Sequence, residues 1–232
     1  EDELGVEIFV RRGKRLVGLT SPGQPIVEAI ERILVDTQNL HKISVQLAAS
    51  DTGSLSIATT HTQARYWLPP IIKAFRQRYP KVHFALRQGS PSQFIELINN
   101  GQADMAVATE GLDHLAELAV FPCYSWHHGV IVPKGHALEA GPLTLEAIAN
   151  HPIVTYAESI TGRAQIDRAF LAAGLAPDIV MTAIDSDVIK AYVELGLGIG
   201  IATSIAFDPD KDTGLSLLRA DHLFAANTTK LG

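Results

Sequence analysis

The run Thr59-Thr60-His61-Thr62-Gln63 brings hydroxyl and amide side chains together at a place that suits ligand binding. The preceding residues predict a strand and the following residues predict a helix. At such a strand end, the free N–H groups and the dipole of the next helix favour an anion. Because no lysine accompanies these residues, the sequence predicts an anion or a zwitterion held by neutral donors.

Two further threonines stand at the ends of predicted elements. Thr161, in the turn Ile160-Thr161-Gly162-Arg163, opens a predicted helix, and Thr109 ends a predicted strand. Each threonine taken singly could act only as a helix cap. Three such positions in two facing lobes favour a ligand-binding cleft.

Other chemistries find little support in the sequence. The glycines of the G-L-G-I-G segment at 196–200 follow a predicted helix and precede a strand, the reverse of a dinucleotide-binding loop, so we expect a helix end and close packing there. None of the nine histidines has a metal-ligand spacing to a cysteine or a carboxylate. Nucleophile-elbow, P-loop and zinc-protease motifs are absent from the sequence. We therefore expect no catalytic residue, no metal and no cofactor.

The composition is that of a folded protein. The chain has 232 residues, of which 47% are hydrophobic and 19% charged, enough for two packed lobes. Its apolar runs are much shorter than the roughly 20 residues of a membrane-spanning helix. The single cysteine, Cys123, lies in an apolar run and is predicted to be a buried, inert thiol.

From residue 54 onward, strand-like and helical segments alternate, which predicts an α/β fold of two doubly wound, Rossmann-like lobes. The predicted strands are 54–60, 82–88, 103–109, 118–124, 128–132, 153–156, 179–184 and 199–204. The predicted helices are 62–79, 90–100, 144–150, 161–173 and 186–195. Two extended stretches in 215–231 are expected to return the chain to the first lobe.

The N-terminal segment differs from the rest of the chain in charge. Residues 7–19 predict a small hairpin, and four basic residues cluster at its tip: Arg11, Arg12, Lys14 and Arg15. Beyond residue 50 acidic residues outnumber basic ones by 18 to 13, which gives no footprint for wrapping nucleic acid. Any contact with DNA is therefore expected at the hairpin.

Residues 21–48 predict one long helix. Mostly apolar residues recur at alternating spacings of four and three, a heptad seam: Ile26, Ile30, Ile33, Thr37, Leu40, Ser44 and Leu47. A helix packed on its own domain is the alternative, but charged residues flank the seam. We expect this helix to pair with another subunit in a homodimer or homotetramer.

Several segments resemble the LysR-type transcriptional regulators. Those similar to the end of the recognition helix, the wing and the linker helix are Leu4-Gly5, Ile8-Phe9, Arg11, Leu19-Thr20 and Gly23. The block T-T-H-T-Q-A-R-Y at 59–66 is similar to the CysB/Cbl branch of that family. So are 88–91, 122–124, 161–163, 187–190 and 228–230. The resemblance covers essentially the whole chain, with most of the helix-turn-helix missing.

The resemblance implies a cytoplasmic regulator of sulfate assimilation and cysteine biosynthesis with a periplasmic-binding-protein-like effector domain and no membrane partner. Its effector would be sulfate, N-acetylserine or O-acetylserine. The implied ligand-binding residues are Thr60, Thr62, Gln63, Thr109, Trp126 and Thr161. Glu158 departs from the branch pattern, and it either points to solvent or signals a different ligand.

The resemblance also implies a division of the chain. Residues 1–20 would be a remnant of the winged DNA-binding domain, with Arg11, Arg12, Lys14 and Arg15 contacting DNA. Residues 21–48 would be the linker helix, 52–123 with 226–232 lobe I, and 124–225 lobe II. The rival interpretation is a two-lobed periplasmic anion or amino-acid binding protein. The basic hairpin and the heptad helix argue against it, because a transport receptor needs neither.

Overall fold

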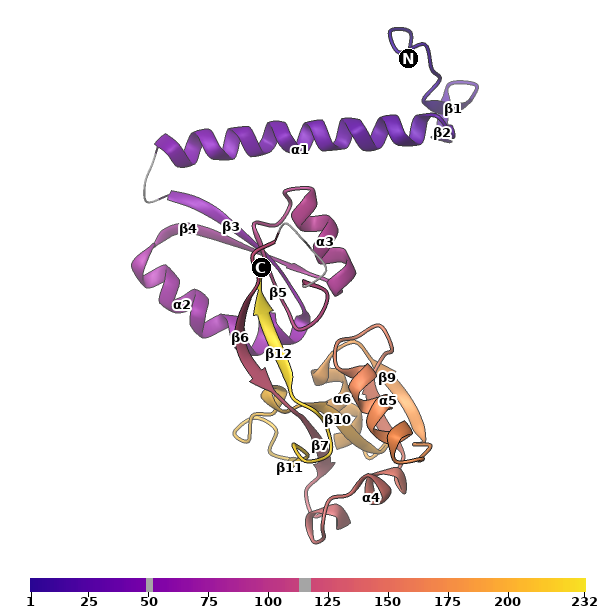
Figure 1. Ribbon diagram of the computed structural model, residues 1–232, viewed down its shortest axis with the longest axis vertical. Coiled ribbons are helices and arrows are strands. Elements are labelled where there is room, and N and C mark those ends of the chain that lie inside the picture. The colour runs from indigo at the N-terminus through magenta and orange to yellow at the C-terminus, as the bar shows by residue number, and fades with distance from the viewer. Residues whose placement is uncertain (49–51, 113–117) are drawn as a thin grey trace.

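The structure is a computed structural model that describes residues 1–48, 52–112 and 118–232. A small hairpin and one long helix precede two α/β lobes, which follow one another along the longest axis of the molecule (Figure 1). The predicted fold class is therefore confirmed.

The N-terminal hairpin consists of β1 (Phe9–Arg12) and β2 (Arg15–Leu19), paired antiparallel. Gly13 makes the turn with a φ of 62°, a conformation that favours glycine. All four basic residues of the predicted patch are exposed. One of them, Arg11, also pairs with Glu1 at 2.8 Å.

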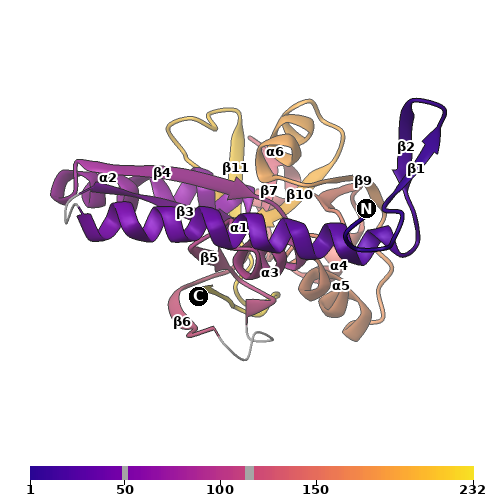
Figure 2. The ribbon, with the colours of Figure 1, turned by 90° about the horizontal axis from the view of Figure 1, so that it is seen from above.

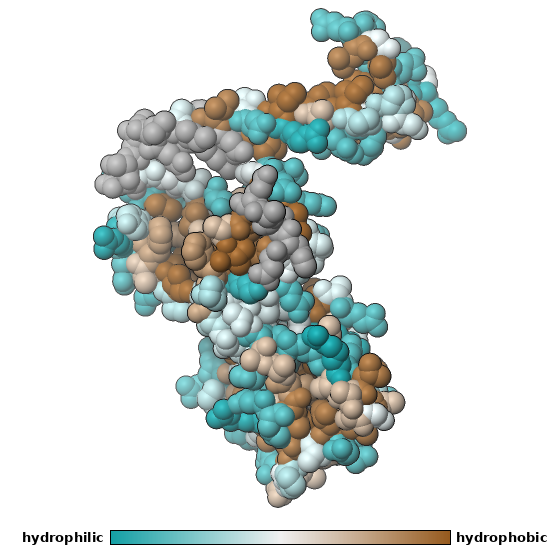
Figure 3. All heavy atoms as spheres, viewed as in Figure 1, coloured by the Kyte–Doolittle hydropathy of each residue, from teal (hydrophilic) through white to brown (hydrophobic). Residues whose placement is uncertain are grey.

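Helix α1 (Gly23–Ala48) begins where the Gly23 N–H donates to Thr20 Oγ1 over 2.9 Å. It passes across lobe I, with the hairpin at its N-terminal end (Figure 2). Hydrophobic surface, brown in Figure 3, alternates with hydrophilic surface along the part of the helix nearer the hairpin. Ile30, Ile33 and Leu40 of the heptad seam are 43%, 64% and 69% exposed, so these side chains are not packed on the chain's own lobe. The side chain of Leu47 lies outside the described part of the chain.

Lobe I is built on a five-stranded sheet in the order β4-β3-β5-β12-β6. Its strands are β3 (Thr52–Thr59), β4 (Lys81–Gln88), β5 (Met105–Ala108), β6 (Phe121–Trp126) and β12 (Asn227–Leu231). Strand β3 runs parallel to β4 and β5, whereas β12 runs antiparallel to β5 and β6. The C-terminal strand thus returns to lobe I, as predicted. The helices of this lobe are α2 (Leu68–Arg78) and α3 (Pro91–Asn99).

Lobe II has a five-stranded sheet in the order β11-β7-β10-β8-β9. Its strands are β7 (His128–Pro133), β8 (Ile153–Tyr156), β9 (Ile179–Ala183), β10 (Ile199–Thr203) and β11 (Leu215–Arg219). Its helices are α4 (Leu145–Ala149), α5 (Arg163–Ala172) and α6 (Ser186–Glu194), with short 3-10 turns at Ala137–Glu139 and Ser204–Ala206. The strands β7, β8 and β10 are almost wholly buried, because their continuous apolar runs pack on both faces.

Three details differ from the predictions. The predicted helix 62–79 is not α-helical throughout, because Gln63–Trp67 form a π-helix, η1, just before α2. Apolar periodicity does not reveal this change of helix type. Cys123 is exposed, so the prediction of a buried thiol is wrong: β6 is the outer strand of its sheet, and an apolar sequence run does not distinguish an outer strand from a central one. The predicted helix 161–173 begins only at Arg163, which leaves Thr161 in the preceding turn.

The glycine segment at 196–200 behaves as predicted. Gly196 follows α6 with a φ of 81°, in the left-handed conformation typical of a helix end. A Cβ at Gly198 would meet the Pro152 carbonyl oxygen at 2.3 Å, so the backbone approach there requires glycine. The segment therefore ends a helix and packs closely.

Candidate functional site

A cavity of about 340 Å³ lies between the two lobes. All six predicted ligand-binding residues line it: Thr60, Thr62, Gln63, Thr109, Trp126 and Thr161. The sequence did not assign the other lining residues to the site: His61, Gln88, Gly89, Ser90, Pro91, Gln93, Tyr156, Ile160, Ile184 and Thr203. Both lobes therefore contribute to one site.

Two helix starts at this cavity have no side-chain cap. In lobe I, the helical run begins at His61 and continues into η1, and Thr62 in its first turn makes no capping hydrogen bond. In lobe II, the residue at the start of α5 is Gly162, which has no side chain to cap with. By contrast, α4 and α6 are capped away from the cavity by Thr144 and Asp185, which accept from backbone N–H groups at 3.1 and 2.9 Å. The helix dipoles favour an anion at both starts. At α5, however, the Arg163 and Gln165 N–H groups already donate to the Ile160 and Gly162 carbonyl oxygens, at 3.2 and 3.1 Å, so fewer N–H groups are available there.

Gly162 explains why α5 starts without a cap. Its φ is 89°, and a Cβ there would lie 2.6 Å from His128 Nε2 and 3.2 Å from the Trp126 ring. The chain therefore needs glycine where other helices carry serine, threonine or aspartate. Burial lowers the pKa of His128 to about 4, so a neutral imidazole lies beneath this helix start.

The third helix start at the cavity, that of α3, is occupied by its own chain. The Ser90 N–H donates to Gln93 Oε1 over 2.8 Å, and Ser90 Oγ lies 3.2 Å from the same oxygen. This N-terminus is therefore satisfied without a ligand. The starts of η1 and α5, one from each lobe, therefore differ from that of α3, because no side chain caps them.

Lobe II lines the cavity with hydroxyl groups. Burial raises the pKa of Tyr156 to about 12, and its hydroxyl accepts from the Thr203 N–H over 3.0 Å and lies 2.6 Å from Ser186 Oγ. The hydroxyls of Thr161 and Thr203 are buried, and neither has a hydrogen-bond partner among the described residues. Buried hydroxyls are normally paired, so these two are available to a bound molecule.

In lobe I the lining side chains belong to a hydrogen-bonded network. Gln63 Oε1 accepts from the Tyr124 hydroxyl over 2.5 Å, and Gln63 Nε2 donates to Thr229 Oγ1 over 3.2 Å. Trp126 Nε1 donates to Thr229 Oγ1 and Thr109 Oγ1, at 3.1 and 3.3 Å. Burial raises the pKa of Tyr124, which keeps its hydroxyl protonated. The network fixes the positions of three predicted ligand-binding residues.

No aspartate, glutamate, lysine or arginine is among the described residues that line the cavity. Glu158 is exposed and lies outside this lining, so it places no charge in the site. Of the two interpretations of Glu158, the structure supports a side chain that points to solvent.

An inter-lobe ion-pair cluster lies beside the cavity. Asp187 of lobe II is 2.6 Å from Arg65 Nε and accepts from the Tyr66 hydroxyl over 2.5 Å. Lys190 Nζ lies 3.4 Å from the same carboxylate and 2.9 Å from Asp212. These side chains join the turn around η1 to α6.

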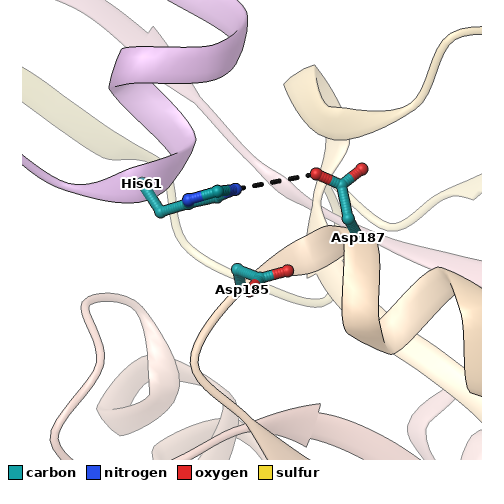
Figure 4. A group of neighbouring side chains, drawn as sticks. All are labelled: His61, Asp185 and Asp187. Carbon is teal, nitrogen blue, oxygen red and sulfur yellow. Dashed lines mark ion pairs between the residues drawn. The ribbon is translucent and has the colours of Figure 1, made fainter. Parts of the chain in front are cut away.

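His61, Asp185 and Asp187 also approach one another at this place, with ligand atoms within 4.8 Å (Figure 4). The sequence spacing gave no sign of this group, because His61 lies in lobe I and the aspartates in lobe II. Asp187 Oδ2 lies 3.7 Å from His61 Nε2 but only 2.6 Å from Arg65 Nε, and Asp185 caps α6. Since a bound cation would compete with Arg65 and Lys190, the geometry fits an ion pair between the lobes better than a metal centre.

The fold and this site define a class of protein: a two-lobed α/β domain that binds a small molecule between its lobes. The family model described as LysR substrate binding domain matches residues 48–225. The chain therefore belongs to the LysR family of transcriptional regulators, of which it carries the effector-binding domain.

The relatives are named as regulators. The HTH-type transcriptional regulators SsuR and CysB of Burkholderia cenocepacia are 57% and 51% identical to this chain, over all of it and over 76% and 74% of their own lengths. The regulator cbl of Escherichia coli is 49% identical over all of this chain and 74% of its own length. These names agree with the prediction that the chain is not an enzyme.

A solved structure supports the same fold. It is titled as the cofactor-binding domain of the Cbl transcriptional regulator, and it is 50% identical with a TM-score of 0.74 over 78% of this chain and 79% of that one. In the described part of this chain, no helix has the length and apolarity needed to cross a membrane.

Proposed function

We propose that the cavity binds sulfate or an acetylserine, and that the chain thereby regulates genes of sulfate assimilation and cysteine biosynthesis. One observation carries this proposal: two helix starts without a side-chain cap, one from each lobe, face a cavity whose described lining has hydroxyl donors and no aspartate, glutamate, lysine or arginine. Such a site attracts an anion through backbone N–H groups and helix dipoles. The likeness to CysB, cbl and SsuR points to the sulfur branch of the family.

The proposed contacts follow from the places of the six residues. Thr60, Thr62 and Gln63 would donate to the anionic group at the start of η1. Thr161 would donate from the start of α5 in the other lobe, where its hydroxyl has no other described partner. Thr109 and Trp126 would complete the site beside Gln63, to which Thr229 links them.

The size and chemistry of the lining also predict different affinities for the three candidate effectors. A volume of about 340 Å³ lies at the lower end of small-molecule pockets, about 300 to 1,000 Å³, and accommodates an acetylserine. Pro91, Ile160 and Ile184 offer apolar surface for an acetyl group. Because no described lining residue carries a carboxylate, the ammonium group of O-acetylserine would lack a counter-charge. We therefore expect sulfate and N-acetylserine to bind better than O-acetylserine.

Regulation would pass from the cavity to DNA through the N-terminal part of the chain. We infer that residues 1–20 are a wing remnant, with Arg11, Arg12, Lys14 and Arg15 against DNA phosphates, and that 21–48 is the linker helix. The exposed residues Ile30, Ile33 and Leu40 would pair with another subunit in a homodimer or homotetramer. Effector binding would change the relative position of the lobes, and with it the geometry of the DNA-binding domains. Such a regulator would act in the cytoplasm.

Calorimetric titration of this chain with the three candidates tests the proposal. Thr62→Ala should weaken sulfate and N-acetylserine binding by about 10- to 100-fold, since a hydrogen bond to a charged group contributes about 1.5 to 3 kcal/mol. Its melting temperature should stay close to that of the wild type, because Thr62 makes no capping hydrogen bond.

Thr144→Ala is the matched control. Thr144 caps α4 outside the cavity, so its loss should cost about 1 kcal/mol of stability and leave the affinity unchanged. The proposal fails if the wild type binds neither anion, or if Thr62→Ala binds both as well as the wild type does.

A further inference from the structure

Thr229 on β12 is fully buried behind the cavity, and its hydroxyl group is the centre of the hydrogen-bonded network in lobe I. It does not line the cavity, yet three lining residues reach its hydroxyl. Gln63 Nε2 lies 3.2 Å from Thr229 Oγ1, Trp126 Nε1 3.1 Å and Thr109 Oγ1 3.3 Å. Its position therefore affects side chains on both sides of β12.

The direction of these hydrogen bonds follows from the donors. An indole N–H can only donate, so Trp126 donates to Thr229. The Gln63 amide is held by Tyr124, whose hydroxyl donates to Oε1, so Nε2 also donates to Thr229. A hydroxyl oxygen has two lone pairs, and both are then occupied. Thr229 consequently donates its own proton to Thr109 over 3.3 Å. Because the Trp126 N–H also reaches Thr109 Oγ1 at 3.3 Å, that oxygen is engaged twice and Thr109 directs its own proton elsewhere.

Two donor protons of the network have no partner within it, and both belong to residues that line the cavity. Thr109 retains its O–H, and Gln63 Nε2 retains its second N–H. Gln63 Oε1, the acceptor of that amide, is engaged by Tyr124. Two side chains that could either donate or accept are thereby set to donate.

We propose that Thr229 is a positioning residue that, together with Tyr124, makes Gln63 and Thr109 present only donors to the effector, so that this end of the cavity selects a deprotonated group such as a carboxylate or sulfate oxygen. The inference rests on the proposed function, because it assumes that the effector occupies this cavity. A group that must itself donate, such as an amide NH₂, finds no acceptor in either side chain.

Thr229→Val tests this with a side chain of similar shape and no hydroxyl. Thr109 then loses the proton that engages its oxygen and becomes free to accept, whereas Tyr124 still holds Gln63 Oε1 and Nε2 loses its acceptor. Calorimetry should show N-acetylserine binding weakened by about tenfold or more, and N-acetylserinamide, with an amide in place of the carboxylate, weakened less. Thr229→Ser keeps the hydroxyl and should restore both the affinity and the preference for the carboxylate.

Thr228→Val is the control, since Thr228 is the neighbouring residue on β12 and contacts the exposed Ser125 hydroxyl at 3.2 Å. It should leave both affinities unchanged. If Thr229→Val does not fold, Thr229→Ala, which also removes the hydroxyl, replaces it, and the preference for the carboxylate should fall in the same way.

The outcomes separate the two proposals. If the wild type binds no anion, the proposed function fails and this inference fails with it. If the wild type binds N-acetylserine but Thr229→Val keeps its affinity, or weakens both ligands by the same factor, only the positioning role is overturned. Equal losses in Thr229→Val and Thr229→Ser would likewise overturn it.

Discussion

The cavity lining and the ion-pair cluster beside it both connect lobe I to lobe II, but they do so with opposite chemistry. The cluster is charged, and its groups are satisfied within the chain: Asp187 meets Arg65, Tyr66 and Lys190, and Lys190 also meets Asp212. Among its described residues the lining has no aspartate, glutamate, lysine or arginine, and only His61 belongs to both regions; the Thr161 and Thr203 hydroxyls of the lining have no described partner. From this contrast we infer that the ion pairs hold the lobes together, whereas the neutral donors are available to a ligand.

One turn of chain serves both regions. In η1, Gln63 is buried and lines the cavity, while Arg65 and Tyr66 face Asp187. A π-helical turn shifts side-chain directions relative to an α-helix, and such turns occur frequently at functional sites. We therefore expect a ligand that shifts Gln63 to affect the inter-lobe contact, which begins two residues further along the chain.

The largest effect is expected from Gly162→Ala, which places a Cβ 2.6 Å from His128 Nε2 at a residue with φ 89°. The start of α5 must then move, and the effector loses donors from lobe II. If two hydrogen bonds to a charged group are lost, calorimetry should show binding weakened by about 100-fold or more.

Gly174→Ala is the control for backbone strain. Gly174 has a φ of 68° and nothing within 4 Å of its Cβ position, so alanine costs about 1 kcal/mol of stability without touching the cavity. If both alanine variants weaken effector binding equally, the start of α5 is not a ligand contact.

A smaller effect is expected from Asp187→Asn in the ion-pair cluster. It should lower the free energy of unfolding by about 1 kcal/mol or less, because Arg65 is largely exposed and Lys190 keeps Asp212. Effector affinity should change by less than about threefold. Asp221→Asn, in the exposed pair with Arg219, is the control and should change neither quantity.

The cluster also predicts a pH dependence. Burial raises the pKa of Asp187, but the Tyr66 hydrogen bond and the charges of Lys190 and Arg65 outweigh it, and the pKa lies below its usual 3.8. A lowered carboxyl pKa stabilises the fold above 3.8, and this contribution is lost as the pH falls through the folded-state pKa. Unfolding curves of the wild type should therefore lose more stability below pH 3.8 than those of Asp187→Asn. Parallel curves would show that the cluster does not hold the lobes together.

The sequence predicted the parts of the site that depend on local order. Thr60, Thr62, Thr109 and Thr161 all stand where a strand ends or a helix begins, and periodicity locates such junctions. The same rule could have found Thr203 and Tyr156, because each is the last residue of a strand, β10 and β8.

The remaining features depend on contacts between distant segments. Thr229 meets Gln63 across 166 positions, and Asp187 meets Tyr66 across 121, so no spacing in the sequence connects them. Cys123 was misplaced for a related reason, since the order of strands in a sheet decides which strand is the outer one. Tertiary packing, not local pattern, sets these features.

The central claim is that an anion binds between the two uncapped helix starts. Crystals of this chain grown without sulfate and soaked in selenate test it directly, because selenium scatters anomalously and selenate has the shape of sulfate. We expect an anomalous peak in the cavity, with selenate oxygens about 2.7 to 3.2 Å from backbone N–H groups at the starts of η1 and α5. We also expect the peak to weaken in Thr62→Ala. An empty cavity, or selenate only at the basic hairpin, would contradict the account.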